Sequence, residues 1–153
     1  MLHGDTAILT VFIGLQTRKM GKFVYRRYQF CTALNAMSIP ESDNLIVRLT
    51  FDFSLLIIDY TERLESQRRY VMANQLMKSG TSIGANVREA QSAESRADFI
   101  HKCKIAAKEA EETDYWLLLC HHAPSYENPG ELLPRLLSIR KVLSKIIGTA
   151  RNS

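Results

Sequence analysis

The histidine, cysteine and acidic residues of this chain suggest two metal sites, and neither has a complete ligand set. A carboxylate-bridged di-metal centre in a helical bundle needs a Glu from each of two helices and a Glu-x-x-His pair from each of the other two. Asp98 and His101 have that spacing, but no other segment supplies a second pair. Cys120, His121 and His122 are adjacent, so on a helix they point in different directions and cannot converge on one ion. We therefore expect no metal and no cofactor.

Acid–base chemistry and phosphate binding also lack a complete motif. The acidic run Glu109, Glu111, Glu112 and Asp114 is typical of a solvated helix face, and Lys108 lies four residues before Glu112. No Ser-His-Asp or Cys-His set can be assembled. The glycines of residues 79–86 do not form a P-loop, because the Gly-Lys-Ser/Thr ending and a preceding strand are missing. The sequence therefore predicts a protein that is not an enzyme.

The same segment, SGTSIGAN, is the most unusual in the chain. A glycine inside a helix costs about 1 kcal/mol relative to alanine, so two of them call for an offsetting reason. Small side chains at Ser79, Gly80, Gly84 and Ala85 would let a neighbouring helix approach closely. Asn86 would then be buried and would need a hydrogen bond within the bundle, which would fix its register. We interpret the segment as a close-packing surface, with a ligand site as the less favoured alternative.

The elements that carry these residues are helices, because apolar residues recur at spacings of three and four. The pattern predicts helices over 43–65, over about 67–92, from Ser92 or Ser95 to about 122, and over about 131–148, where Gly148 would end the last helix. Prolines and Gly130 mark a loop before the fourth helix. Four such helices with short connections predict an all-α, antiparallel up-down-up-down four-helix bundle.

Residues 1–40 differ from residues 41–150, which we assign to the bundle domain. They form an N-terminal arm with five basic residues and one acidic residue, whereas the remaining chain has 15 of each. The arm lacks the helical periodicity, and Met20 and Met37 offer later starts, so it is either a peripheral tail or the product of a mis-assigned start codon. Its apolar run is about half the roughly 20 residues that span a membrane.

The cellular location follows from the cysteines and from that apolar run. Three cysteines, an odd number without metal-ligand spacing, indicate reduced thiols. The arm's basic cluster follows its apolar run, which is the reverse of a signal peptide. We therefore expect a cytoplasmic protein without membrane contact.

Two kinds of surface residue are candidates for binding. The formal net charge of +4 directs attention to basic residues of the predicted helices, although each could be an ordinary solvated charge. The candidates for nucleic-acid or partner binding are Arg68, Arg69, Lys78, Arg88, Lys102, Lys104 and Lys108. The third helix is apolar nearly all round in its second half, which is typical of burial on more than one side. The candidates for an oligomer interface there are Tyr115, Trp116, Leu118 and Leu119, unless the arm covers them.

One long run carries a family resemblance. The run SGTSIGANVREAQSAESRADFIHKCKIAAKEAEETDYWLLL, with NLIVRLTFDFSLLIIDY upstream and the leucine-rich last helix, resembles the 23S rRNA-intervening-sequence protein family over residues 44 to about 147. The resemblance implies a four-helix bundle that assembles into a ring-like homopentamer. Family members are encoded within intervening sequences of bacterial large-subunit rRNA genes or stand alone. No catalytic residue is attributed to the family.

A related branch of that family implies a partner as well. It serves diversity-generating retroelements as the accessory protein that binds the reverse transcriptase and nucleic acid. The sequence thus predicts a non-enzymatic oligomeric scaffold that contacts RNA or DNA, or a nucleic-acid-handling partner such as a reverse transcriptase. The alternative is a purely structural or protein-interaction bundle without nucleic-acid binding, which the balanced charge of residues 41–153 favours.

Overall fold

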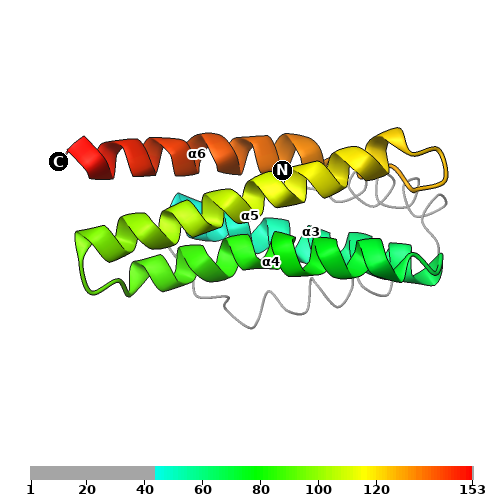
Figure 1. Ribbon diagram of the computed structural model, residues 1–153, viewed down its shortest axis with the longest axis horizontal. Helices are drawn as coiled ribbons and strands as arrows, with labels where there is room; N and C mark the ends of the chain where they lie inside the picture. Colours follow the sequence, from blue (N-terminus) through cyan, green and yellow to red (C-terminus); the bar gives the residue numbers. More distant parts are fainter. Residues whose placement is uncertain (1–43, 153) are drawn as a thin grey trace, which may run out of the picture. The chain divides into compact units, whose positions relative to one another are not determined.

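A computed structural model of the chain describes residues 44–152, which form four α-helices (Figure 1). The helices are α3 (Leu45–Ser66), α4 (Tyr70–Gln91), α5 (Arg96–His122) and α6 (Leu132–Asn152). No β-strand occurs within this range, and none of its helices is long and apolar enough to cross a membrane. The predictions about the N-terminal arm lie outside the described residues.

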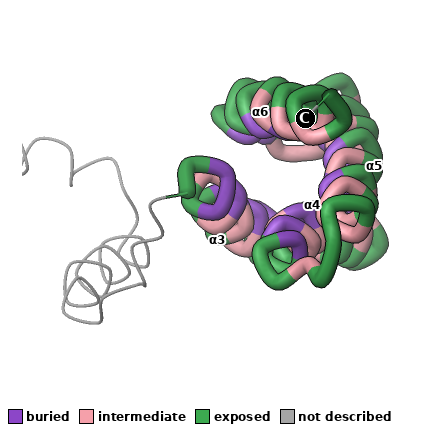
Figure 2. The backbone as a smooth tube through the Cα atoms, turned by 90° about the vertical axis from the view of Figure 1, so that its left-hand side faces the viewer, coloured by how far each residue is buried: buried purple, intermediate pink, exposed green. Residues whose placement is uncertain are grey.

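The four helices are arranged as the sequence predicts. Seen end-on, they follow one another around a common interior in the order α3, α4, α5, α6, and their buried faces point inward (Figure 2). Each helix packs on the next, and α3 also contacts α6. Short connections make successive helices antiparallel (Figure 1). The predicted all-α four-helix bundle is therefore confirmed.

The structure shows where α5 begins and where α6 ends. Ser95, and not Ser92, begins α5, because its Oγ accepts a hydrogen bond of 3.1 Å from the backbone N–H of Asp98. The prediction that Gly148 ends the last helix is wrong, since α6 continues to Asn152. Gly148 has no left-handed backbone of the kind that a helix-ending glycine needs, and Arg96 Nε donates to the carbonyl oxygen of Ala150 at 2.6 Å, which fastens this final turn to α5.

The core consists of apolar side chains and a few hydroxyls. Its largest fully buried members include Phe53, Ile57, Tyr60, Leu64, Leu76, Ile83, Leu117, Leu136, Ile139 and Leu143. The buried hydroxyls of Thr50, Thr61, Ser79 and Thr113 each donate to a carbonyl three or four residues earlier in their own helix. These polar groups are thus satisfied without a partner on a facing helix.

The small residues of α4 allow α3 to approach closely. A Cβ atom built on Gly80 would lie 2.8 Å from Ile57 Cγ1, and one on Gly84 would lie 3.2 Å from Ser54 Oγ and 3.4 Å from the carbonyl oxygen of Thr50. The contacts of Asn86 do not match the prediction that this residue fixes the register of the bundle. It is half-buried, and its Nδ2 donates to the carbonyl oxygen of Ser82 on its own helix at 2.9 Å. This bond to the preceding turn joins Asn86 to its own helix and to no facing one.

The turn between α3 and α4 has an unexpected residue at its tightest point. Arg69 N–H bonds to the carbonyl of Leu64 at 2.9 Å, and Arg68 N–H bonds to that of Glu65 at 2.8 Å. This pair of bonds defines a Schellman motif, in which the residue at the position of Arg68 is usually glycine. Arg68 has a φ of 61°, in the left-handed region that glycine tolerates best.

Replacing Arg68 with glycine is expected to raise the free energy of unfolding by about 1 kcal/mol, because the left-handed conformation costs about 1–2 kcal/mol for other residues. The side chain of Arg68 is exposed, so little packing is lost. Urea denaturation measures the change, and Arg68→Ala is the control, since alanine removes the side chain but keeps the strain. Equal stabilities of the two variants would contradict the prediction.

Candidate nucleic-acid and subunit interface

The basic residues proposed from sequence do not form one cluster. Arg68 and Arg69 lie in the α3–α4 turn, whereas Arg88 lies 19 or more residues further along α4, which is about 29 Å at about 1.5 Å per residue. Lys104 and Lys108 lie on α5 and are exposed. Any nucleic-acid contact must therefore use a subset of them.

Two of the seven side chains have partners within the fold. The Arg69 guanidinium lies 4.9 Å from the centre of the Tyr126 ring and donates from Nη2 to the carbonyl oxygen of Ser125 at 3.2 Å. Lys102 Nζ lies 2.5 Å from Glu89 Oε2, and this hydrogen bond raises the pKa of the lysine. Arg69 therefore anchors the α5–α6 loop, and Lys102 links α5 to α4.

The other five of the seven are exposed basic side chains. They are Arg68, Lys78, Arg88, Lys104 and Lys108. Ion pairs within residues 44–152 involve other basic groups. These five are the sequence-predicted contacts whose charge stays available to a partner.

The register between α5 and α6 is set near both ends of their contact. At one end Arg96 of α5 bonds to Ala150 of α6. Nearer the other end, Arg140 of α6 pairs with Glu111 at 2.7 Å and with Asp114 at 3.0 Å, both on α5. Since the two helices are antiparallel, the residues between these contacts follow in opposite order.

This register places two further exposed lysines at the levels of the sequence-predicted pair on α5. Lys141 and Lys145 are exposed on α6, at about the same levels as Lys108 and Lys104. We call these four residues the α5–α6 lysines. The sequence analysis missed Lys141 and Lys145, although their spacing of four and their position outside the apolar stripe of the last helix could have indicated an exposed basic face.

The predicted interface residues of α5 divide into exposed and packed side chains. Tyr115 is 56%, Leu118 40% and Leu119 38% exposed. Trp116 instead packs against the core, and its Nε1 donates to Glu112 Oε1 at 3.2 Å. Leu137 of α6 is 49% exposed, and the α5–α6 register brings it level with Tyr115 and Leu118. We call Tyr115, Leu118, Leu119 and Leu137 the α5–α6 apolar patch.

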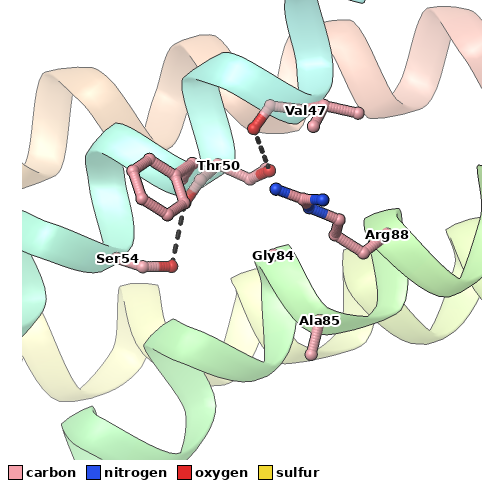
Figure 3. Close-up of a pocket in the computed structure, with 7 residues that line it drawn as sticks. Val47, Thr50, Ser54, Gly84, Ala85 and Arg88 are labelled. Atoms are coloured by element: carbon pink, nitrogen blue, oxygen red, sulfur yellow. Dashed lines mark hydrogen bonds between the residues drawn. The ribbon is translucent and has the colours of Figure 1, made fainter. Parts of the chain in front are cut away.

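A shallow groove of about 220 Å³ lies between α3 and α4 (Figure 3). It is lined by Val47, Thr50, Phe51, Ser54, Gly84, Ala85 and Arg88. The Ser54 hydroxyl, which lines the groove, donates to the carbonyl oxygen of Thr50 at 2.9 Å and therefore has a hydrogen-bond partner. The Arg88 side chain reaches from α4 towards Thr50 on α3 (Figure 3). We call this feature the α3–α4 groove.

Within residues 44–152, the candidate metal ligands do not gather around one point, and the thiols are buried. Among residues 44–152, no three His, Cys, Asp or Glu side chains are placed to hold a metal ion. Asp98 lies in the first turn of α5 and His101 is exposed on the next. Cys103 and Cys120 are buried, and burial raises the pKa of both thiols, which keeps them protonated and weakly nucleophilic near neutral pH.

Comparisons with known proteins agree with this architecture. The family described as 23S rRNA-intervening sequence protein matches residues 42–145. The chain is also similar to a Bacteroides thetaiotaomicron protein whose crystal structure is described as that of a protein with unknown function from the S23 ribosomal protein family. The two are 40% identical with a TM-score of 0.65, over 67% of this chain and 98% of that one. No curated protein matches the chain.

Proposed function

The chain belongs to the 23S rRNA-intervening sequence protein family, and from this premise we propose that it is a non-enzymatic, homo-oligomeric scaffold of the cytoplasm that contacts nucleic acid. The observation that carries the proposal is the division of the α5–α6 surface. One half holds the α5–α6 lysines, and the other half holds the α5–α6 apolar patch. The Arg140 ion pairs lie between the two halves.

The apolar patch supports self-association. Four large apolar side chains, each at least 38% exposed, lie on two adjacent helices. Exposed apolar patches on a protein surface often mark interaction sites. Aromatic residues such as Tyr115 are enriched in protein interfaces. The family resemblance suggests a homopentamer as the assembly.

The lysines support contact with phosphate groups. Ion pairs between protein residues involve none of the four within the described range, so each is available to neutralise a phosphate. An oligomer would repeat the set in every subunit and so raise the local positive charge of a domain that is neutral overall. A reverse transcriptase, the partner of the related retroelement branch, is the alternative binding partner.

Nucleic-acid contact is tested by measuring affinity for a structured RNA and a DNA duplex across a salt series. We expect the affinity to fall steeply as the salt concentration rises. In a plot of the logarithm of the binding constant against the logarithm of the salt concentration, each phosphate neutralised on a duplex contributes about −0.9 to the slope. Replacing the α5–α6 lysines with glutamine should flatten this slope. The control replaces Arg48 and Lys78, two exposed basic residues of α3 and α4 that are absent from the ion pairs of the described range, and should keep it. If the parent protein bound neither the RNA nor the DNA at low salt, the proposed nucleic-acid contact would be wrong, and the structural or protein-interaction bundle would be the function that stands.

Self-association is tested by light scattering on the full chain. We expect the parent to be an oligomer and Leu118→Glu to be a folded monomer, because a charge in the apolar patch would be buried without a partner. Val71→Glu is the control, since Val71 is 80% exposed at the start of α4 and lies outside the patch. If the parent protein were monomeric at micromolar concentration, the proposal of a homo-oligomeric scaffold would be wrong.

A further inference from the structure

The α3–α4 groove and the α5–α6 apolar patch lie on different helix pairs of the same bundle. We propose that the groove of one copy of this chain receives the apolar patch of the next copy. The inference rests on the homo-oligomer proposed above and goes beyond it, because it assigns the two surfaces that meet at each contact. A contact between two different surfaces is heterologous, and it closes into a ring or extends into a fibre.

One of the two surfaces is hollow and the other projects. Gly84 has no side chain and Ala85 only a methyl group, so the α4 wall of the groove is low, and Val47 and Phe51 supply apolar atoms on α3. On the other surface, Tyr115 and Leu118 project from α5 with about half of their area exposed. Helices pack by placing the side-chain ridge of one into the groove of the other. The exposed ridge of α5 is therefore a suitable occupant for the groove.

The charges of the two surfaces favour a second copy as that occupant. Arg88 reaches over the groove (Figure 3), and the ion pairs formed within residues 44–152 do not include it. On α5, the exposed carboxylate Glu112 comes three residues before Tyr115, which places both side chains on one side of the helix. Glu112 accepts a bond from Trp116 through Oε1 alone. An α5 ridge seated in the groove can thus bring a carboxylate to Arg88.

The experiment mixes two full-length variants, each blocked on one surface. Ala85→Arg fills the groove from an exposed position, and Leu118→Glu disables the patch. Each variant alone should be monomeric in light scattering. A 1:1 mixture should form a heterodimer and stop there, because only the patch of the first variant and the groove of the second remain intact. Circular dichroism confirms that both variants are folded.

The outcomes separate this inference from the proposed function. If Ala85→Arg keeps the parent's oligomer while Leu118→Glu is monomeric, the patch binds something other than the groove, and the inference fails while the scaffold stands. A mixture that stays monomeric also overturns the inference. A monomeric parent overturns both.

A charge exchange provides a second test that leaves the groove's shape unchanged. Arg88→Glu should weaken assembly at least tenfold, and adding Glu112→Lys to the same chain should restore it, because each junction then has opposite charges again. Arg48→Glu is the matched control, since Arg48 is exposed on α3 outside the groove lining. Failure of Glu112→Lys to restore assembly would contradict the pairing of these two residues.

Discussion

A Gly80→Leu variant is expected to lose about 3 kcal/mol of unfolding free energy, because overpacking a well-packed core costs about 1–3 kcal/mol and occasionally more. The Cβ atom of any side chain at this position would lie 2.8 Å from Ile57 Cγ1. Ile57 has no exposed area, so its side chain is enclosed by other atoms and cannot yield by moving into solvent. Gly80→Ala should also destabilise, although alanine gains about 1 kcal/mol in helix propensity. Urea denaturation measures both variants.

Two other helical glycines provide matched controls. A Cβ atom on Gly148 meets nothing within 4 Å, so Gly148→Ala should stabilise the protein by about 0.5–1 kcal/mol. A Cβ atom on Gly84 lies 3.2 Å from Ser54 Oγ, and this tight contact offsets most of the same gain, so Gly84→Ala should be nearly neutral. If all three alanine variants were equally stabilised, helix propensity alone would decide, and the close approach of α3 to α4 would be contradicted.

Replacing Tyr60 with alanine is expected to cost about 3–5 kcal/mol, the range for removing a large buried aromatic side chain. Tyr60 is fully buried, and its hydroxyl donates to the carbonyl oxygen of Glu127 at 2.5 Å. Tyr60→Phe should cost only about 0.5–1.5 kcal/mol, the net value of one hydrogen bond. Tyr70→Phe is the control, because Tyr70 is 56% exposed and should have almost no effect. An equally small effect of Tyr60→Phe would show that the bond to the loop contributes nothing.

The same residue predicts a change in stability at alkaline pH. Burial raises the pKa of Tyr60 above its ordinary value of 10.0. Above about pH 10 the unfolded chain therefore releases a proton that the folded chain keeps, so the free energy of unfolding falls as the pH rises. Below that pH the contribution is fully present. Urea denaturation at pH 8 to 11 should show a shallower decline for Tyr60→Phe than for the parent or for Tyr70→Phe.

Much of the fold could be predicted because the information lies within single helices. Spacings of three and four identify the face of each helix that is buried. The sequence also offers Ser92 and Ser95 as capping residues for α5, and the structure selects Ser95. The end of α6 could not be predicted in the same way. Its last turn contacts α5 through the bond from Arg96 to Ala150, which joins residues 54 positions apart.

The candidate interface depended on contacts between helices and was predicted only in part. Tyr115, Leu118 and Leu119 could be recognised as surplus apolar residues on one helix. Leu137, Lys141 and Lys145 become relevant only when the ion pairs of Arg140 align α6 with α5. The α3–α4 groove needs the same kind of information, because its lining comes from two helices whose relative position the periodicity leaves open.

The fit between Ile57 and Gly80 also limits how the helices can move. The four buried hydroxyls bond within their own helices, so they do not oppose the sliding of one helix past another. Shape opposes a slide in one direction, because a shift of α3 by about one turn, 5.4 Å, would move Ile57 from the level of Gly80 to that of Leu76, whose fully buried side chain occupies the space that Gly80 leaves open. Helices that interlock in this way move between discrete packing arrangements and do not slide continuously. We therefore expect α3 and α4 to move as one rigid body in any rearrangement of the bundle.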